Sequence, residues 1–379
     1  MRRLAVIPSD PIKAYLDAGL GETWLREYYN PGKIFDEVYL LSPLEENNPD
    51  LAGMRVIKTK GRQLRKRLRR LHIDVVRAYG GFWACDMACN NKISGVPVVV
   101  SVHDTNPEKL HDSIKRADIV FSVSNIVNEL VLAKFNNREN AWILPNRINF
   151  DEMRPYSREE TVDLDRLYPF KHRIIHIGRK TRQKNLDTLI RSLRILGKDY
   201  CLIAAGRGRA DEFAGLAKDS GVSGRCFFIE SINNKELARY YSWADCMCNP
   251  SRWEGFGIIF IEALACAGVI VTSDIAPMNE YIRHMFNGLL VRDYEDPQAL
   301  ARMIRIACDD EKIRQALRFN SRASVEKFEK SRIDTLESGY YKRILNMKEN
   351  NAFVTPVHKK IAWRINESVK NLAMSVMKG

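Results

Sequence analysis

The 379-residue sequence has no uninterrupted apolar run close to the roughly 20 residues that a membrane-spanning helix needs. Its first residues, Met1-Arg2-Arg3, lead directly into a short apolar segment instead of the longer apolar core of a secretory signal. We therefore expect a cytoplasmic protein.

The 8 cysteines lack the paired spacing of a metal site, and most of them lie in apolar contexts. We expect free thiols in the core and no metal ion. Acidic residues are also in deficit, because 47 Asp and Glu face 60 Lys and Arg, for a formal net charge of +13. This excess predicts an anionic partner, and charge alone leaves open whether it is a nucleotide, a phospholipid surface, a polyanionic acceptor or nucleic acid.

Apolar segments of strand length alternate with helix-length segments, an order typical of parallel sheets covered by helices. In the first half the expected strands are Leu4–Ile7, Glu37–Leu41, Arg55–Ile57, Asp74–Ala78, Val96–Val102, Ile119–Ser122 and Trp142–Leu144. In the second half they are Arg173–Gly178, Cys201–Ala205, Cys226–Ile229, Cys246–Cys248, Val269–Thr272 and Leu289–Val291. The length suggests about two domains. We place them at 1–150 and 173–330, with a linker at 151–172 and C-terminal helices at 331–379.

The most informative stretch is 251–262, in which Glu254 and Glu262 flank a Gly-Phe-Gly turn and the apolar run 258–261. A carboxylate in such a run costs several kcal/mol unless it finds a partner. Glu254 precedes the turn and Glu262 lies about one turn into the expected helix, so both can face one ligand across the helix N-terminus. The alternative is an ordinary buried helix with a caged glutamate.

This pair, with Asn249-Pro250-Ser251 before it and 263–273 after it, resembles the signature of retaining GT-B glycosyltransferases of family 4. The resemblance covers about residues 1–345. It implies an α/β fold of two Rossmann-like domains whose parallel sheets face each other across a cleft. It also implies transfer of a sugar from a UDP- or GDP-linked donor to a hydroxyl acceptor, as in polysaccharide biosynthesis, with retention of configuration and without a cofactor.

The resemblance assigns roles to the residues of this stretch. Glu254 is expected to bond the sugar hydroxyls as a catalytic residue, and Glu262 to bond the ribose. The residues expected to line the donor between them are Gly255, Phe256, Gly257 and Ile258.

Three further residues complete the implied donor site. Arg179 and Lys184 follow a strand that ends in glycine and would form a diphosphate clamp, because preorganised cations lower the barrier as the leaving group gains charge. His103 follows the most apolar strand and would line the donor sugar. The alternatives are two solvated cations and a structural histidine.

The candidates for the acceptor side are Asp10, Tyr79 and Gly80, which come at the carboxyl ends of strands, where ligands sit in such sheets. For Asp10, a turn former is the alternative.

A basic segment, Arg62–Leu71, has leucines at helical spacing and cations elsewhere. It is interpreted either as a solvated surface helix or as a contact with anionic lipid on the inner face of the membrane. Nucleic acid is disfavoured because no aromatic residues are interleaved for stacking. A second basic amphipathic segment, 359–378, would dock on the first domain or lie in a membrane interface.

Other functions remain open. A sugar-nucleotide epimerase or a phosphorylase has a similar two-domain fold. A non-catalytic protein that uses the basic helix to bind lipid or nucleic acid belongs to a different class.

Overall fold

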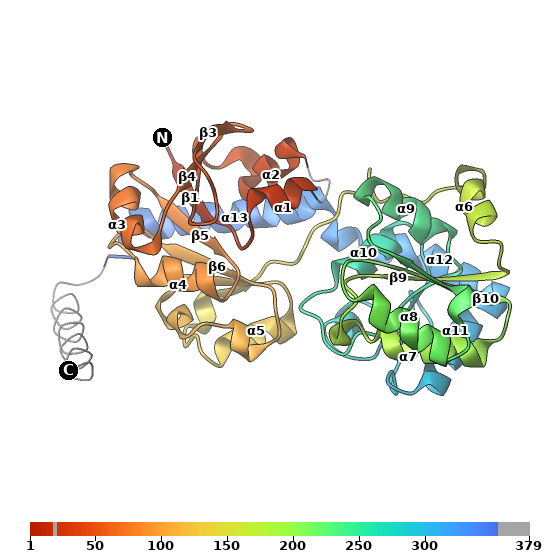
Figure 1. The fold of residues 1–379 in the computed structure, drawn as a ribbon. Helices are drawn as coiled ribbons and strands as arrows, with labels where there is room; N and C mark the ends of the chain where they lie inside the picture. The colour runs from red at the N-terminus through yellow and green to blue at the C-terminus, as the bar shows by residue number, and fades with distance from the viewer. Residues whose placement is uncertain (18–20, 355–379) are drawn as a thin grey trace, which may run out of the picture.

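The computed structural model describes residues 1–17 and 21–354 as two α/β domains, each built on one sheet (Figure 1). The first sheet has eight strands in the order β3-β4-β2-β1-β5-β6-β7-β8, and the second has six in the order β11-β10-β9-β12-β13-β14. Every pairing is parallel except that of β3 with β4. The expected two parallel sheets are thereby confirmed.

The strands of the first domain are β1 (Arg3–Ile7), β2 (Glu37–Ser42), β3 (Asn48–Leu51), β4 (Met54–Lys58), β5 (Val75–Tyr79), β6 (Val98–Val102), β7 (Ile119–Ser122) and β8 (Ala141–Ile143). Its helices are α1 (Ile12–Asp17), α2 (Glu22–Tyr29), α3 (Gly61–Arg70), α4 (Trp83–Asn90) and α5 (Asn125–Leu132). Side chains of α3, α4 and α5 are buried on one face of the sheet, and those of α1 and α2 on the other.

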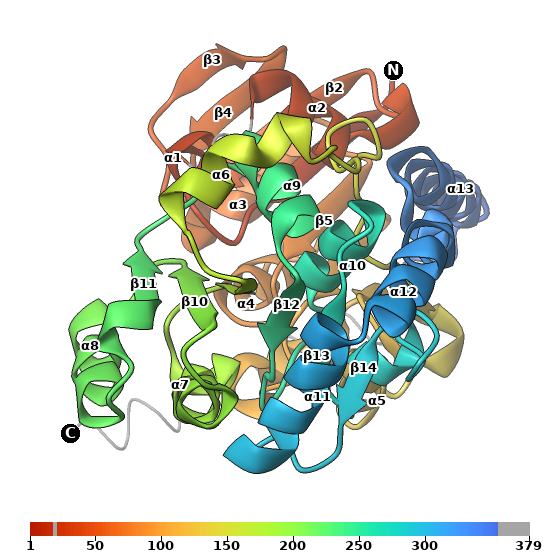
Figure 2. The same cartoon turned by 90° about the vertical axis from the view of Figure 1, so that its right-hand side faces the viewer.

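The strands of the second domain are β9 (His172–Ile177), β10 (Tyr200–Ala205), β11 (Cys226–Ile229), β12 (Cys246–Asn249), β13 (Ile270–Ser273) and β14 (Leu289–Val291). Helix α6 (Val162–Leu167) lies within the predicted linker. The helices after it are α7 (Leu186–Leu196), α8 (Ala210–Asp219), α9 (Asn234–Trp243), α10 (Ile258–Ala265), α11 (Pro297–Asp309), α12 (Glu311–Ser324) and α13 (Lys330–Glu349). Helices α7, α8 and α11 pack on one face of this sheet and α9 and α10 on the other (Figure 2).

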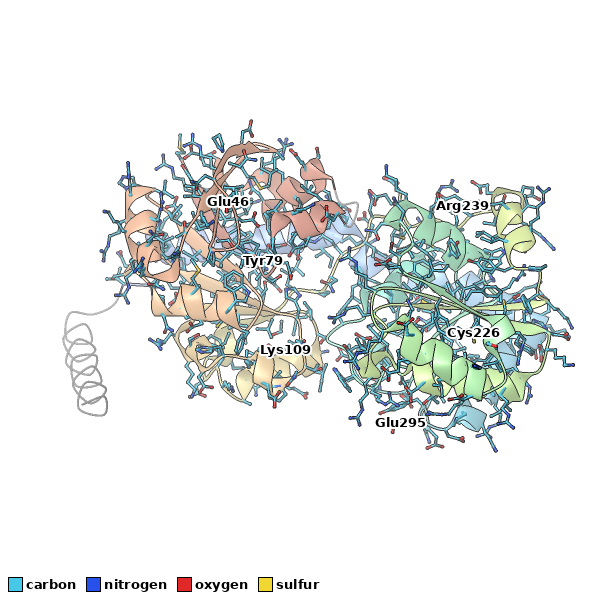
Figure 3. All side chains as sticks on the ribbon, in the orientation of Figure 1. Glu46, Tyr79, Lys109, Cys226, Arg239 and Glu295 are labelled. Atoms are coloured by element: carbon cyan, nitrogen blue, oxygen red, sulfur yellow. The ribbon has the colours of Figure 1, made fainter. Side chains whose placement is uncertain are left out.

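The chain passes between the domains twice. It first leaves β8, and the segment before β9 then contacts the second domain, where Tyr156 N donates to Ser242 Oγ at 3.0 Å. Arg239 of α9, labelled in Figure 3, donates a hydrogen bond to Asp163 of α6. The chain returns through α13, whose Tyr341 is fully buried in the first domain.

Two details differ from the expectations. Strand β3 was not predicted, because its exposed sequence Asn-Pro-Asp-Leu has neither apolar alternation nor β-branched residues and only lines the sheet edge. Asn185 stands at the N-cap position of α7, where an asparagine side chain ordinarily accepts a bond from a helix N–H, but its side chain makes no capping bond. It instead accepts from Thr188 Oγ1 at 2.6 Å and donates to the carbonyl of Tyr294 at 2.9 Å.

All eight cysteines are buried free thiols, as expected. Among the described helices, none is both long and apolar enough to cross a membrane. The second basic segment, 359–378, lies outside the described residues.

Candidate active site

A cleft of about 360 Å³ lies between the two domains and is lined by both. Its lining residues are His103, Asp104, Asn146, Gly178, Arg179, Gln183, Lys184, Glu254, Gly255, Phe256, Gly257, Ile258 and Ile259. The structure thus brings together all the predicted donor-side residues except Glu262. They converge because they stand at or just beyond the carboxyl ends of β6, β9 and β12, where ligands bind in parallel sheets.

Glu254 and Lys184 meet in this cleft. The Nζ of Lys184 donates to Oε1 of Glu254, and the Ser251 hydroxyl donates to the same oxygen at 2.8 Å. Since both bonds go to Oε1, Oε2 is left to accept a bond from a ligand hydroxyl.

The loops that carry this pair are tied to each other by Gln183, which our sequence interpretation did not single out. Its side-chain amide donates to the carbonyl of Trp253 at 2.9 Å, and its own carbonyl accepts from Arg252 N at 2.8 Å. In the sequence, the only sign of this role was the position of Gln183 between the two predicted cations, Arg179 and Lys184. These bonds hold the loop after β9, which carries Lys184, against the loop after β12, which carries Glu254, before any ligand binds.

Lys180 is a second residue that sequence reasoning missed. Its ammonium group donates to the carbonyl of Ile229 at 2.8 Å and also to that of Gly206. Burial lowers the pKa of Lys180. Through these two hydrogen bonds, Lys180 joins the ends of β10 and β11 to the loop after β9. Its neighbour Arg179 is instead exposed in the cleft.

The start of α10 faces the cleft. Gly257 occupies the N-cap position with a positive φ of 76°, and it has no side chain to cap the helix. The first backbone N–H groups of α10, at Ile258 and Ile259, therefore offer donors and the positive end of the helix dipole at the cleft wall.

Glu262 lies farther along α10 and is only partly buried, outside the lining of the cleft. Its Oε2 accepts a hydrogen bond from the Tyr241 hydroxyl at 3.1 Å. Desolvation raises the pKa of Glu262 to about 7. The partner that its apolar surroundings require is thus a tyrosine of α9, and the carboxyl group titrates near neutral pH.

His103 stands on the first-domain wall of the cleft. The residue is partly open to solvent, but the surrounding protein desolvates the imidazole, and this desolvation, together with the charge of Arg77, lowers its pKa to about 4. The imidazole is therefore neutral at physiological pH and acts as a hydrogen-bonding group.

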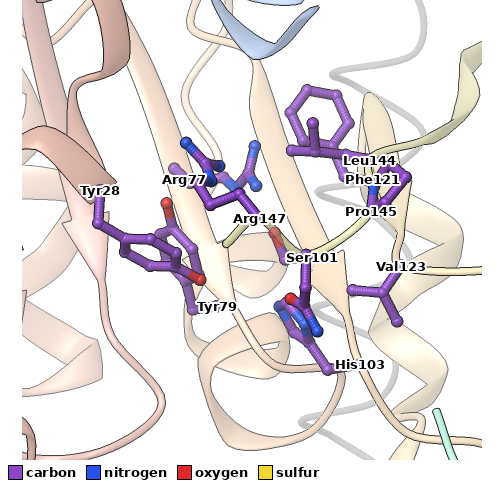
Figure 4. A pocket seen from close by; sticks show the side chains of 11 residues that line it. Tyr28, Arg77, Tyr79, Ser101, His103, Phe121, Val123, Leu144, Pro145 and Arg147 are labelled. Carbon is purple, nitrogen blue, oxygen red and sulfur yellow. The ribbon is translucent and has the colours of Figure 1, made fainter. Parts of the chain in front are cut away.

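A smaller cavity of about 20 Å³ adjoins the cleft and shares His103 and Asn146 with it (Figure 4). Arg77 lines it, only 2% exposed, with its guanidinium 4.1 Å from the ring centre of Phe121. Tyr79, an acceptor-side candidate, also lines this cavity. The volume suits about one water molecule.

The other acceptor-side candidates are placed elsewhere. Asp10 is exposed and accepts from the Ser9 hydroxyl at 2.7 Å, outside the linings of both cavities. Gly80 has a positive φ of 98° and packs beside Ser9. The structure does not gather the three acceptor candidates into one pocket.

Helix α3 carries the basic segment on the surface of the first domain. Leu64 and Leu68 are buried in the core, whereas Arg62, Lys66, Arg69 and Arg70 are exposed. The apolar face of α3 is thus already covered by protein, and only its cationic face meets solvent.

Comparisons with known proteins agree with this architecture. Anabaena HepE, solved in complex with UDP and glucose, superposes with a TM-score of 0.74 over 90% of this chain and 100% of that one, at 16% identity. An uncharacterized glycosyltransferase of Methanocaldococcus jannaschii is 28% identical over 242 residues, which are 60% of each chain. A D-inositol 3-phosphate glycosyltransferase of Jonesia denitrificans is 28% identical over 166 residues, 41% of this chain and 39% of that one. The chain thus spans 39–60% of the length of these two curated relatives.

Two Rossmann-like domains that face each other across a shared cleft define the GT-B fold. Within it, residues 165–324 match the family model of glycosyl transferases group 1. The match covers the part of the chain that holds Arg179, Lys184 and Glu254 of the cleft.

Proposed function

We propose that the protein is a retaining glycosyltransferase of family 4, which moves a sugar from a nucleoside diphosphate sugar to a hydroxyl acceptor. The observation that carries the proposal is the gathering of Arg179, Lys184, Glu254 and His103 around one interdomain cleft. The complex of HepE with UDP and glucose supports a donor of this kind.

The residues of the cleft divide the donor between them. Arg179 and Lys184 bind the diphosphate, and their charges stabilise it as the glycosidic bond breaks, without a metal ion. Glu254 accepts hydrogen bonds from the sugar hydroxyls through the oxygen that faces away from Lys184. The backbone N–H groups at the start of α10 donate hydrogen bonds to the nucleotide sugar. Glu262 accepts a hydrogen bond from the ribose in place of the one from the Tyr241 hydroxyl.

Retention follows from attack on the same face of the sugar that the diphosphate leaves. The acceptor hydroxyl then passes its proton to the departing phosphate oxygen as the new C–O bond forms. The neutral His103 imidazole orients the sugar from the first domain and takes no proton in this step. The acceptor, a glycan, a lipid-linked or a small molecule, binds on the first-domain side of the cleft, near Tyr79.

Turnover of the donor tests this function against an epimerase or a phosphorylase. With UDP- and GDP-sugars as donors, NMR of the sugar product should show acceptor-dependent transfer with an unchanged anomeric configuration. Epimerised nucleotide sugar formed without acceptor would favour the epimerase, and a pyridoxal absorbance band would favour the phosphorylase.

We further propose that the protein is cytoplasmic and binds the inner face of the membrane through the exposed cations of α3. Their attraction for anionic headgroups is worth about 1 kcal/mol per Lys or Arg near the surface. Cosedimentation with phosphatidylglycerol vesicles should fall in Arg62→Glu/Lys66→Glu/Arg69→Glu and with added salt. Equal binding to neutral phosphatidylcholine vesicles would contradict it.

A further inference from the structure

The two domains touch each other across the cleft at a contact made by side chains at the start of α5. The Ser124 hydroxyl donates to the carbonyl of Gly255 at 2.6 Å. Next to it, Asn125 Nδ2 donates to Oε2 of Glu280 at 3.0 Å. We call these four residues the interdomain clasp.

At the interdomain clasp, the backbone of Gly255 packs against the first domain where a side chain would otherwise stand. A Cβ placed on Gly255 would lie 1.9 Å from the carbonyl oxygen of His103 and 2.8 Å from its carbonyl carbon. Real Cβ atoms essentially never approach other heavy atoms closer than 3.0 Å. The backbone of His103, in the first domain, thus occupies the space that any other residue at position 255 would need.

The glycine is not required by the local conformation of its loop. Gly257 has a positive φ of 76°, which favours glycine, whereas Gly255 is not among the residues with positive φ. The nearest atoms to a Cβ at 255 all belong to His103 and Asp104 of the other domain. An alanine at 255 is therefore compatible with the second domain by itself and incompatible with the closed contact.

We infer that Gly255 and Ser124 are positioning residues that set how closely the domains approach. This contact places the backbone of His103 against Gly255, the residue after Glu254, so that His103 and Glu254 line one cleft and both reach one donor sugar. The catalytic consequence rests on the proposed function, whereas the closure itself does not. A donor bound by the second domain alone would still bind when the clasp is broken, but transfer would slow.

The first test compares Gly255→Ala with Gly215→Ala. Gly215 lies in α8, and a Cβ there meets nothing within 4 Å. Small-angle X-ray scattering of the full chain should show a larger radius of gyration for Gly255→Ala than for the wild type and Gly215→Ala. An unchanged radius of gyration in a Gly255→Ala protein of native melting temperature would overturn the inference.

Kinetics separate positioning from folding. Gly255→Ala should lower kcat by about a hundredfold, because displacement of a reacting group by about 1 Å has such an effect. The Kd for the nucleoside diphosphate should stay within about threefold, since both cations of the clamp stay in place. A loss of nucleotide affinity in parallel with kcat would overturn the inference, because it would show that the glycine serves the donor site and not the approach of the domains.

A second variant covers the case in which Gly255→Ala does not fold. Ser124 also caps α5, where its oxygen accepts from Val127 N. Ser124→Asp keeps a capping acceptor but offers no proton to the carbonyl of Gly255. It should open the domains and lower kcat in the same direction, and wild-type scattering and turnover in this variant would overturn the inference.

Crosslinking gives a readout that needs no activity. In an Asn125→Cys/Glu280→Cys protein the two thiols replace exposed side chains that touch across the domains, whereas the eight native cysteines are buried. A short bis-maleimide should join them efficiently, and adding Gly255→Ala should reduce the yield. An equal yield in both backgrounds would overturn the inference. If the wild type bound no nucleoside diphosphate, the proposed function would fail while these closure results would stand.

Discussion

Lys184 donates a hydrogen bond to Glu254, so that a cation from the loop after β9 and a carboxylate from the loop after β12 neutralise each other in the cleft. The two side chains are only 12% and 7% exposed. A nucleoside diphosphate sugar presents a phosphate to the cation and hydroxyl groups to the carboxylate. Donor binding therefore replaces part of an existing ion pair and adds new bonds to both partners.

Lys184→Ala should destabilise the protein as well as weaken donor binding. It leaves Glu254 with the Ser251 hydroxyl and no cation, and removing one partner of a buried pair costs about 3–5 kcal/mol. The free energy of unfolding in urea measures this loss. The double variant Lys184→Ala/Glu254→Gln should recover stability but not donor affinity. A Lys184→Ala protein as stable as the wild type would contradict the pairing.

Arg179→Ala should affect binding alone. The side chain is exposed in the cleft, so its removal should change stability by less than about 0.5 kcal/mol. Loss of a charged hydrogen bond to the diphosphate should weaken binding by about 1.5–3 kcal/mol, or roughly 10- to 150-fold. Calorimetric titration with UDP and GDP measures this change. Arg182→Ala is the matched control, because Arg182 is exposed in the same loop but does not line the cleft.

The carboxyl group of Glu262 should make nucleotide affinity depend on pH. Its folded-state pKa of about 7 lies above the ordinary value of 4.5, so the neutral form prevails below pH 7. A ribose hydroxyl that donates to Glu262 favours the charged form, and affinity should rise as the pH rises from 6 to 8. Over this range the affinity of the wild type relative to Glu262→Gln should increase by about tenfold. The comparison cancels the ionisation of the nucleotide itself, and a constant ratio would argue against the ribose contact.

Ionisation of Glu262 should also change the free energy of unfolding, which should fall as the pH rises. Because burial raises the folded-state pKa of Glu262, its carboxyl group contributes stability at acidic pH that is lost as the pH rises through 7. Urea denaturation at pH 5 and pH 8 should show a gain for Glu262→Gln, relative to the wild type, at the higher pH. No relative gain would indicate that the carboxyl group is ionised at acidic pH.

The buried charges that hold α13 to the first domain should be sensitive to single substitutions. Glu337 is fully buried, accepts a bond from Arg147 and lies 3.6 Å from Arg77. Glu337→Gln should cost about 3–5 kcal/mol, because it leaves the buried guanidinium of Arg77 without its counter-charge and Arg147 with Asp334 alone. Asp17→Asn breaks an exposed pair with Lys13 and should cost less than about 1 kcal/mol. Similar urea midpoints for the two variants would contradict this role.

Much of the fold could be predicted from the sequence, because buried parallel strands are continuous apolar runs. Val98–Val102 is such a run and is buried along its whole length. Strand β3 could not be predicted, since its exposed residues carry no apolar pattern. Asn185 shows a similar limit, because its side chain is engaged by Tyr294, far away in the sequence.

For the site, sequence reasoning succeeded where a motif is local. The stretch 254–258 occupies the cleft as one continuous loop and helix start. The position of Glu262 outside the cleft was harder to predict, because it depends on the course of α10 and on the hydrogen bond from Tyr241. The requirement for glycine at 255 arises from a carbonyl of the other domain, and no local pattern encodes such a contact.

Binding of a nucleoside diphosphate in the cleft through Arg179 and Lys184, the cations after β9, underlies the proposed transfer. Thermal unfolding of the wild type, Arg179→Ala and Arg182→Ala with millimolar UDP, GDP and ADP, and with their sugars, tests it most directly. A ligand present at 100 times its Kd stabilises a protein by about 2.7 kcal/mol. We predict that one nucleotide and its sugar raise the Tm of the wild type and Arg182→Ala by several degrees and that of Arg179→Ala much less. An unchanged Tm of the wild type with every nucleotide and nucleotide sugar would rule out the cleft as a nucleoside diphosphate site.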